Sequence, residues 1–223
     1  MILYHGSEKI IEKPSYGQGN LRNDYGRGFY CTANEELAKE WACSNNQNGF
    51  ANKYELDIDG LKILHLNSEQ YNLLNWLAVL TKNRTYWENS TISELAKKYI
   101  YENFMVDTSG YDVIIGYRAD DSYFSFAQDF VSGAISYRQL GEAMHLGKLG
   151  EQIVLISPRA FERMEYISSS IAEAGIYYKK KRERDRMARK AYRKAKSEDL
   201  SVDELLIVDI MREGMKQDDA RLR

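Results

Sequence analysis

The stretch Gly26-Arg27-Gly28-Phe29-Tyr30-Cys31-Thr32 predicts how the N-terminal half of this chain folds. We expect its residues 27–32 to form a strand that ends at the surface, followed by a helix that Thr32 or Asn34 caps and that runs to Ala42. The helix places Trp41 about two turns after the cap, so its ring can fold back towards the strand. Tyr30 on the strand and Trp41 on the helix are therefore expected to lie close together.

Two other motifs lie far from this stretch in the chain. Tyr4-His5-Gly6-Ser7 ends a short strand expected over residues 1–5, and Gly150-Glu151-Gln152 opens an apolar strand expected over residues 152–156. A histidine next to a glycine, two aromatic residues and a late glutamate suit a site that binds the nicotinamide ribose of NAD and breaks its glycosidic bond. Breaking this bond develops positive charge on the sugar, and a carboxylate stabilises that charge selectively in the transition state. Glu151 is therefore the candidate catalytic residue; the structural alternative is an exposed glutamate at a strand start.

The N-terminal motif and the two aromatic residues suit binding of the nicotinamide end of NAD. The imidazole of His5 can bond a ribose hydroxyl, Gly6 lets the backbone approach the carboxamide, and Ser7 adds a hydroxyl. Tyr30 and Trp41 can form the walls against which the nicotinamide ring stacks. Each residue also has a structural alternative, because one ordinary hydrogen bond satisfies a histidine and single aromatic rings usually pack in a core.

The rest of the chain predicts an α+β fold, because short strands alternate with helices that cluster in its middle. A doubly wound dinucleotide-binding fold is not expected, since the glycines around Arg27 do not form GxGxxG and no βαβ unit follows. We expect a body over residues 1–174 and a helical extension over 175–223. The further expected elements are strands at 53–58, 62–66, 111–117 and 165–169, and helices at 68–80, 93–105, 122–131 and 137–145.

The net charge of −2 conceals a strong asymmetry along the chain. Residues 179–196 carry eleven basic and two acidic side chains, a balance of +9, so the remainder carries −11. A helix over residues 177–196 could contact the phosphates of a nucleic acid, pack against the acidic body, or bind an inhibitory protein. After it, a capping box at residues 201–204 predicts a second helix with an apolar stripe over residues 205–211.

Several classes of protein are not expected. No apolar run approaches the roughly 20 residues of a membrane-spanning helix, and the first residues lack the pattern of a signal peptide, so we expect a cytoplasmic protein without membrane contact. Cys31 and Cys43 are expected to be free thiols. The three histidines and two cysteines show no ligand spacing, so no metal site is expected.

The three motifs together resemble those of the ADP-ribosyltransferase superfamily, in the branch of diphtheria toxin and the poly(ADP-ribose) polymerases. This resemblance implies a split β-sheet core in which His5, Gly6 and Ser7 bind NAD, Tyr30 and Trp41 enclose the nicotinamide, and Glu151 is catalytic. Trp41 replaces the second tyrosine of that branch. The whole chain is also similar to a bacterial family catalogued as domain of unknown function 3990.

The resemblance implies an NAD-dependent ADP-ribosyltransferase, with NAD as substrate and a macromolecular acceptor, either protein or nucleic acid. It also implies a bacterial or phage-related toxin, with an antitoxin as partner. Because Leu149 stands two residues before Glu151, the pattern of arginine-modifying relatives is absent. Two alternatives stay open: an NAD glycohydrolase, and an inactive module that binds ADP-ribosyl groups or nucleic acid, the latter if Gln152 occupies the catalytic position.

Overall fold

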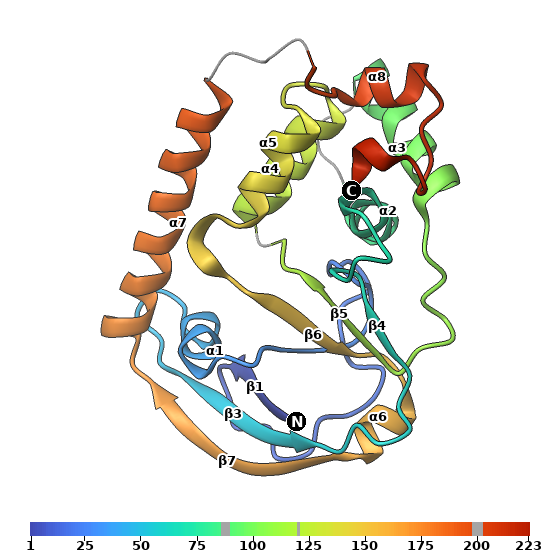
Figure 1. The fold of residues 1–223 in the computed structure, drawn as a ribbon. Helices are drawn as coiled ribbons and strands as arrows, with labels where there is room; N and C mark the ends of the chain where they lie inside the picture. Colours follow the sequence, from blue (N-terminus) through green and yellow to red (C-terminus); the bar gives the residue numbers. More distant parts are fainter. Residues whose placement is uncertain (86–89, 120, 198–202) are drawn as a thin grey trace.

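Two β-sheets and a layer of helices make up the computed structural model, which describes residues 1–85, 90–119, 121–197 and 203–223 (Figure 1). The first sheet is antiparallel and has the strand order β1-β3-β7. Its strands are β1 (Ile2–Ser7), β3 (Gly49–Leu56) and β7 (Met164–Ala172). These strands bring the first and the last third of the chain together.

The second sheet has the order β2-β6-β5-β4 and is mixed, because β4 and β5 run parallel while the other pairs are antiparallel. Its strands are β2 (Phe29–Cys31), β6 (Glu151–Leu155), β5 (Val113–Tyr117) and β4 (Ile63–His65). A single bridge between Tyr4 and Thr32 joins the two sheets within the described ranges. The predicted α+β class is thus confirmed, with two separate sheets.

Helix α1 (Glu35–Ala42) leaves the second sheet and packs on the first. Asn34 is its N-cap, since the side-chain oxygen accepts hydrogen bonds from the backbone N–H groups of Glu36 and Leu37. Thr32 supports the cap by accepting a bond from the Asn34 N–H. The cap that the sequence left open between these two residues is therefore Asn34.

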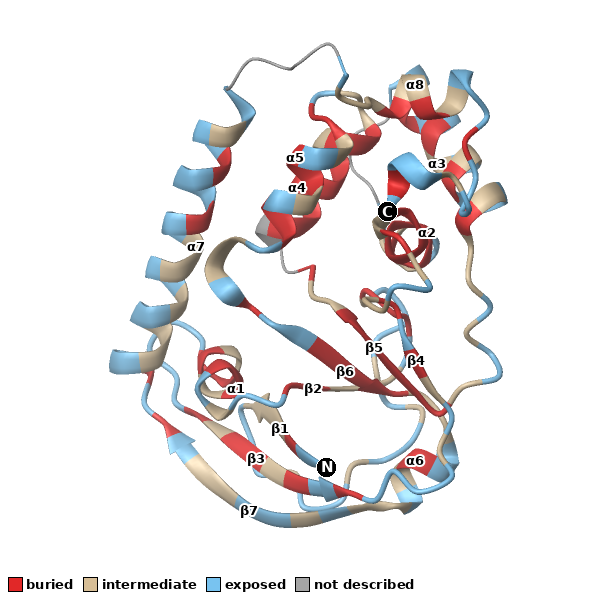
Figure 2. Ribbon diagram, in the orientation of Figure 1, coloured by how far each residue is buried: buried red, intermediate tan, exposed pale blue. Residues whose placement is uncertain are grey.

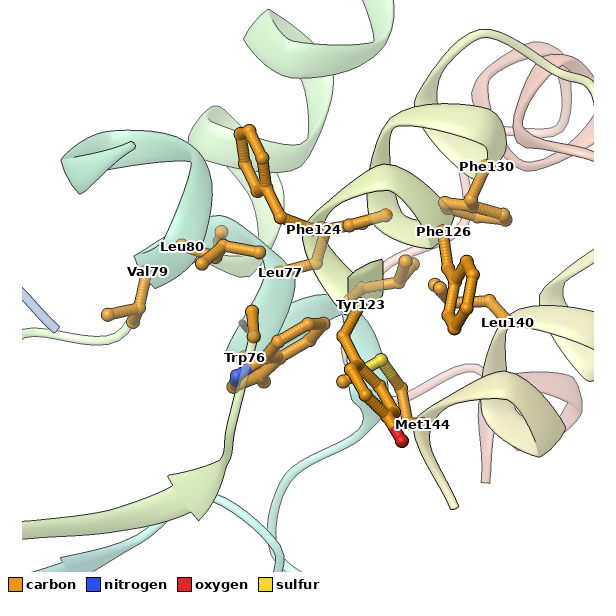
Figure 3. Close-up of a cluster of buried hydrophobic side chains, with 14 of the residues drawn as sticks. Trp76, Leu77, Val79, Leu80, Tyr123, Phe124, Phe126, Phe130, Leu140 and Met144 are labelled. Carbon is orange, nitrogen blue, oxygen red and sulfur yellow. The ribbon is translucent and has the colours of Figure 1, made fainter. Parts of the chain in front are cut away.

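Helices cover the second sheet on the side away from the first (Figure 1). They are α2 (Leu73–Asn83), α3 (Thr91–Phe104), α4 (Asp121–Val131), α5 (Tyr137–Met144) and α8 (Ile207–Arg212), with short turns η1 (Leu146–Lys148) and η2 (Ala220–Leu222). Trp76, Tyr123 and Phe126 lie in the core between these helices and the sheet (Figure 3). A smaller core that includes Leu3, Cys31 and Leu56 lies between the two sheets, and α6 (Pro158–Glu162) closes it.

Helix α7 (Ala174–Lys196) runs along one side of the molecule, next to α1, η1, α4 and α5 (Figure 1). Its Tyr192 is buried and stacks on Phe126 with ring centroids 3.8 Å apart, and its Ala188 is buried as well. Side chains of α7, α8 and η2 belong to the same hydrophobic core as α2 to α5. The boundary after residue 174 stays a prediction, but both parts contribute to one core.

Two expected helix starts differ from the structure. The helix expected from residue 68 begins at Leu73, because Asn72 and Asn75 form a capping box there while Ser68 bonds the carbonyl of His65. The helix expected after a cap at 201–204 begins at Ile207, where Asp209 accepts from the Leu206 N–H. Residues 201 and 202 of that cap lie outside the described residues.

Candidate functional site

A cavity of about 920 Å³ opens between β1, β2, α1, β6 and α7, and we call it the first cavity. Its volume lies within the range of sites for small molecules and cofactors, roughly 300–1,000 Å³. The loop between β1 and β2 forms one wall through residues such as Lys13, Gln18 and Asp24. Of the sequence-predicted site residues, His5, Gly6, Tyr30 and Trp41 line it, together with Gln152. Ser7 and Glu151 do not.

His5 is held in one orientation at the cavity wall. Its Nδ1 lies 2.7 Å from the carbonyl oxygen of Tyr30, and its ring stacks on Phe29 with centroids 4.3 Å apart. Because a carbonyl only accepts, Nδ1 must donate, which leaves Nε2 of the neutral ring as an acceptor. Burial lowers the pKa of His5, although the bond to Tyr30 opposes that shift. A neutral imidazole with an acceptor nitrogen suits a ligand hydroxyl.

Gly6 is required first of all by the packing of α1. A Cβ at this position would lie 2.1 Å from the carbonyl oxygen of Ala38 and 2.9 Å from the backbone nitrogen of Ala42. Ser7 has a structural role, since its hydroxyl donates to the carbonyl of Lys9 and accepts from the side chain of Asn52. The sequence suggested ligand contacts for both residues, whereas close packing and turn geometry account for the structure observed at each.

Tyr30 forms a fixed wall of the first cavity. Its hydroxyl donates to the carbonyl of Gly26 at 2.5 Å and accepts from the Tyr25 N–H at 3.1 Å. Burial raises the pKa of this phenol far above its ordinary value, so the group stays protonated. Tyr30 can therefore offer its ring to a ligand, while its hydroxyl is engaged in the preceding turn.

Trp41 carries a cation on its ring. The guanidinium carbon of Arg118 lies 3.5 Å from the ring centroid, a close cation–π contact. The preceding residue, Glu40, is buried and accepts two hydrogen bonds from Arg184 of α7, at 2.7 and 2.8 Å. This bidentate pair holds α7 against α1 at the cavity wall. Arg118 therefore occupies one face of the Trp41 ring.

Gln152 and Glu151 lie on opposite faces of β6, because side chains alternate along a strand. Gln152 is 6% exposed and lines the first cavity, and among the described residues its Oε1 has no hydrogen-bond partner. Glu151 is exposed and accepts from the side-chain amide of Asn67 at 3.1 Å. The uncertainty in register left by the sequence thus has a geometric answer: Gln152, not Glu151, reaches the cavity wall.

The lining of the first cavity is strongly basic. Seven of its residues are Lys or Arg and three are Asp or Glu. Sequence reasoning missed the cations that come from three separate segments, namely Arg84, Arg118 and Arg184. Of these, only Arg184 lies in the strongly basic segment 179–196, and no local signal in the sequence indicated Arg84 or Arg118. Such an excess of cations favours an anionic ligand.

The described ranges contain no group of three or more His, Cys, Asp or Glu side chains that could hold a metal ion. Within those ranges no helix is both long and apolar enough to cross a membrane.

A family model described as "Protein of unknown function (DUF3990)" matches residues 1–166. Comparison with curated proteins and with solved structures gives no match.

Proposed function

We propose that this chain, which belongs to the DUF3990 family, is an NAD-dependent ADP-ribosyltransferase that binds NAD in the first cavity. The observation that carries the proposal is the convergence of His5, Gly6, Tyr30 and Trp41 on one cavity with a large excess of positive charge. These residues come from three separate elements. A dinucleotide matches this lining. Its diphosphate can pair with the cations, its ribose hydroxyls can donate to the imidazole of His5, and its flat rings can stack on the aromatic side chains.

NAD would use the site in a defined way. The Nε2 of His5 accepts a hydrogen bond from a ribose hydroxyl, and the ring of Trp41 stacks on nicotinamide once Arg118 has moved from it. The guanidinium of Arg118 can then pair with the diphosphate. The carbonyl of Gln152, which has no partner among the described residues, can accept from an amide or amino group of the ligand, which would satisfy a buried polar atom.

The reaction breaks the bond between the ribose carbon and the nicotinamide nitrogen. Nicotinamide leaves with the bonding electron pair, and a nucleophile of the acceptor bonds to the same carbon and loses its proton. Glu151 is the proposed stabiliser of the positive charge, although its side chain lies on the face of β6 opposite Gln152 and does not line the first cavity. The role therefore requires the reacting ribose to lie at the exposed end of β6, beyond the lining of that cavity, where Glu151 accepts one hydrogen bond, from Asn67. A preorganised charge of this kind contributes about 10²- to 10³-fold to a rate.

The position of Gln152 favours a second candidate function, a module that binds NAD or ADP-ribosyl groups without reacting. A neutral amide at the cavity wall can bond a ligand, but it carries no negative charge to stabilise an oxocarbenium ion. Hydrolysis of NAD, with water as the acceptor, remains an alternative outcome of the same chemistry.

The test is to incubate the protein with adenine-labelled NAD and a cell lysate, and to measure both released nicotinamide and labelled macromolecules. We expect both signals from the wild type and a loss of about 10²-fold or more in Glu151→Gln. Glu165→Gln is the matched control, since Glu165 is an exposed glutamate on a strand of the other sheet.

The outcomes separate the candidate functions. Nicotinamide release without labelled macromolecules indicates a hydrolase. Tight NAD binding by calorimetry without turnover, weakened in Gln152→Ala, indicates the binding module. Absence of both binding and turnover refutes the proposal.

A further inference from the structure

A second cavity, of about 620 Å³, lies on α7 beside the first. It is lined by α7 together with Asn45 and Asn46 of the loop after α1. Four residues of α7 line both cavities, which makes the two neighbours: Tyr178, Arg182, Asp185 and Arg189. One helix face therefore connects the wall of the first cavity to a groove on the surface.

The shared residues follow helical spacing. They stand at i, i+4, i+7 and i+11, and Arg193 of the second cavity continues the series at i+15. Residues at these intervals lie in one stripe along a helix. We call Tyr178, Arg182, Asp185, Arg189 and Arg193 the basic stripe. From Arg182 to Arg193 it is about 16 Å long, at roughly 1.5 Å per residue.

The contacts of α7 with the body do not neutralise its charge. Of the eleven cations in residues 179–196, three pair with the body and two with acids on α7 itself. Within the described part of the chain the other six have no ion-pair partner: Lys179, Lys181, Arg182, Lys190, Arg193 and Lys194. Arg182 and Arg193 of the basic stripe are both exposed, as is most of the outer side of α7 (Figure 2).

From this arrangement we infer that the basic stripe binds the phosphate backbone of a single-stranded nucleic acid and directs the strand to the first cavity. Arg182 and Arg193 are exposed and have no ion-pair partner among the described residues, so they suit phosphates of one strand, whereas Arg189 is paired with Asp185. The half-buried ring of Tyr178 offers a face on which a base can stack where the two cavities meet. A single strand fits better than a duplex, since its bases are open to a cavity without unpairing. This inference rests on the proposed function: the bound strand is the acceptor of ADP-ribose.

The binding test uses labelled 12-nucleotide single strands of RNA and of DNA, without NAD, and follows fluorescence anisotropy between 50 and 200 mM salt. Each phosphate contact contributes about 0.7 to the slope of log affinity against log salt for a single strand. The variant Arg182→Gln/Arg193→Gln removes two contacts, so we expect the slope to fall by about 1.4. Glutamine keeps helix propensity close to that of arginine, so α7 is expected to persist.

The matched control is Lys190→Gln/Lys194→Gln, which removes the same charge from lysines outside the basic stripe. We expect it to keep the wild-type slope. An equal fall in both variants, or no binding of either oligonucleotide at 50 mM salt, would overturn the inference. So would competition by a polyglutamate peptide as strong as that by the unlabelled oligonucleotide, because it would indicate an acidic protein as the partner.

A second measurement separates this inference from the proposed function. Labelled NAD is added to the bound oligonucleotide, and we expect the label on the nucleic acid. Nicotinamide release with an unlabelled oligonucleotide overturns the acceptor assignment and leaves the reaction standing. Absence of NAD turnover refutes the proposed function, while the anisotropy result still decides whether the basic stripe binds the strand.

Discussion

Replacement of Gly6 by alanine tests whether packing, rather than ligand binding, requires this glycine. A Cβ here would meet the carbonyl oxygen of Ala38 at 2.1 Å, about 1.3 Å short of the 3.4 Å at which ordinary contact begins. It would also meet the backbone nitrogen of Ala42 at 2.9 Å. Since both neighbours are backbone of α1, no side-chain rotation relieves the clash, and helix and strand must separate.

The magnitude follows from the geometry. Overpacking in a well-packed interior costs about 1–3 kcal/mol, and a clash with two backbone atoms belongs at the upper end, about 3 kcal/mol. For a chain of this length, each kcal/mol lowers the melting temperature by about 2–4 °C. Gly6→Ala is therefore expected to melt about 6–12 °C below the wild type, without NAD present.

Thermal unfolding followed by circular dichroism measures the effect, and Gly141→Ala is the control. Gly141 lies inside α5, and a Cβ added there would meet nothing within 4 Å, so alanine should stabilise the helix by about 0.5–1 kcal/mol. A Gly6→Ala protein that melts within about 2 °C of the wild type, the smallest shift expected for 1 kcal/mol, would refute the packing argument. It would return Gly6 to the role suggested by its motif, close approach to a ligand.

Three further predictions concern the cavity wall. Arg184→Ala leaves the buried carboxylate of Glu40 unpaired and should lower the free energy of unfolding, measured in urea, by about 3–5 kcal/mol. The double variant Glu40→Met/Arg184→Met removes both charges and should recover this stability. A double variant as unstable as Arg184→Ala would contradict this reasoning. The pKa of His5 in the folded state lies below its ordinary 6.5, so on acidification the unfolded chain takes up a proton at His5 before the folded chain does. The free energy of unfolding should therefore fall as pH drops below 6.5, and it should fall less steeply in His5→Gln. An equal slope in both proteins would contradict this assignment. Trp41→Ala should weaken NAD binding about two- to tenfold by calorimetry, and unchanged affinity would exclude stacking on this ring.

Local signals in the sequence predicted most elements of the fold. The cap at Asn34 with its acidic first turn, the apolar run after Glu151 and the length of the basic helix each depend on neighbours within a few residues. Signals of this kind involve only residues close together in the chain and need no tertiary contact, so they can be recognised in the sequence. The helix starts at Leu73 and Ile207 were harder to predict from the sequence. Ser68 and Asn72 are both suitable caps for the first helix, and the second helix has the apolar Leu206 at its N-cap position.

The candidate site could be predicted from the sequence only in part. The convergence of His5, Tyr30 and Trp41 on one cavity was predicted from motifs far apart in the chain, and the structure places all three there. The sequence could not predict whether Glu151 or Gln152 reaches that cavity. Side chains alternate along a strand, so the two residues must lie on opposite faces of β6, but alternation does not say which face borders the cavity. Pairing of β6 with β2 and β5 decides it.

By itself, the sequence determined the helices, the strands and the charge that each carries, since these follow from periodicity and composition over short distances. Only the tertiary structure decided what covers each face: that α1 presses on Gly6, that Arg184 of α7 binds the buried Glu40, and that a row of arginines continues from the cavity to the surface. The physical reason is that a repeat of two or 3.6 residues shows which side chains share a face, whereas the neighbour of that face comes from a distant part of the chain.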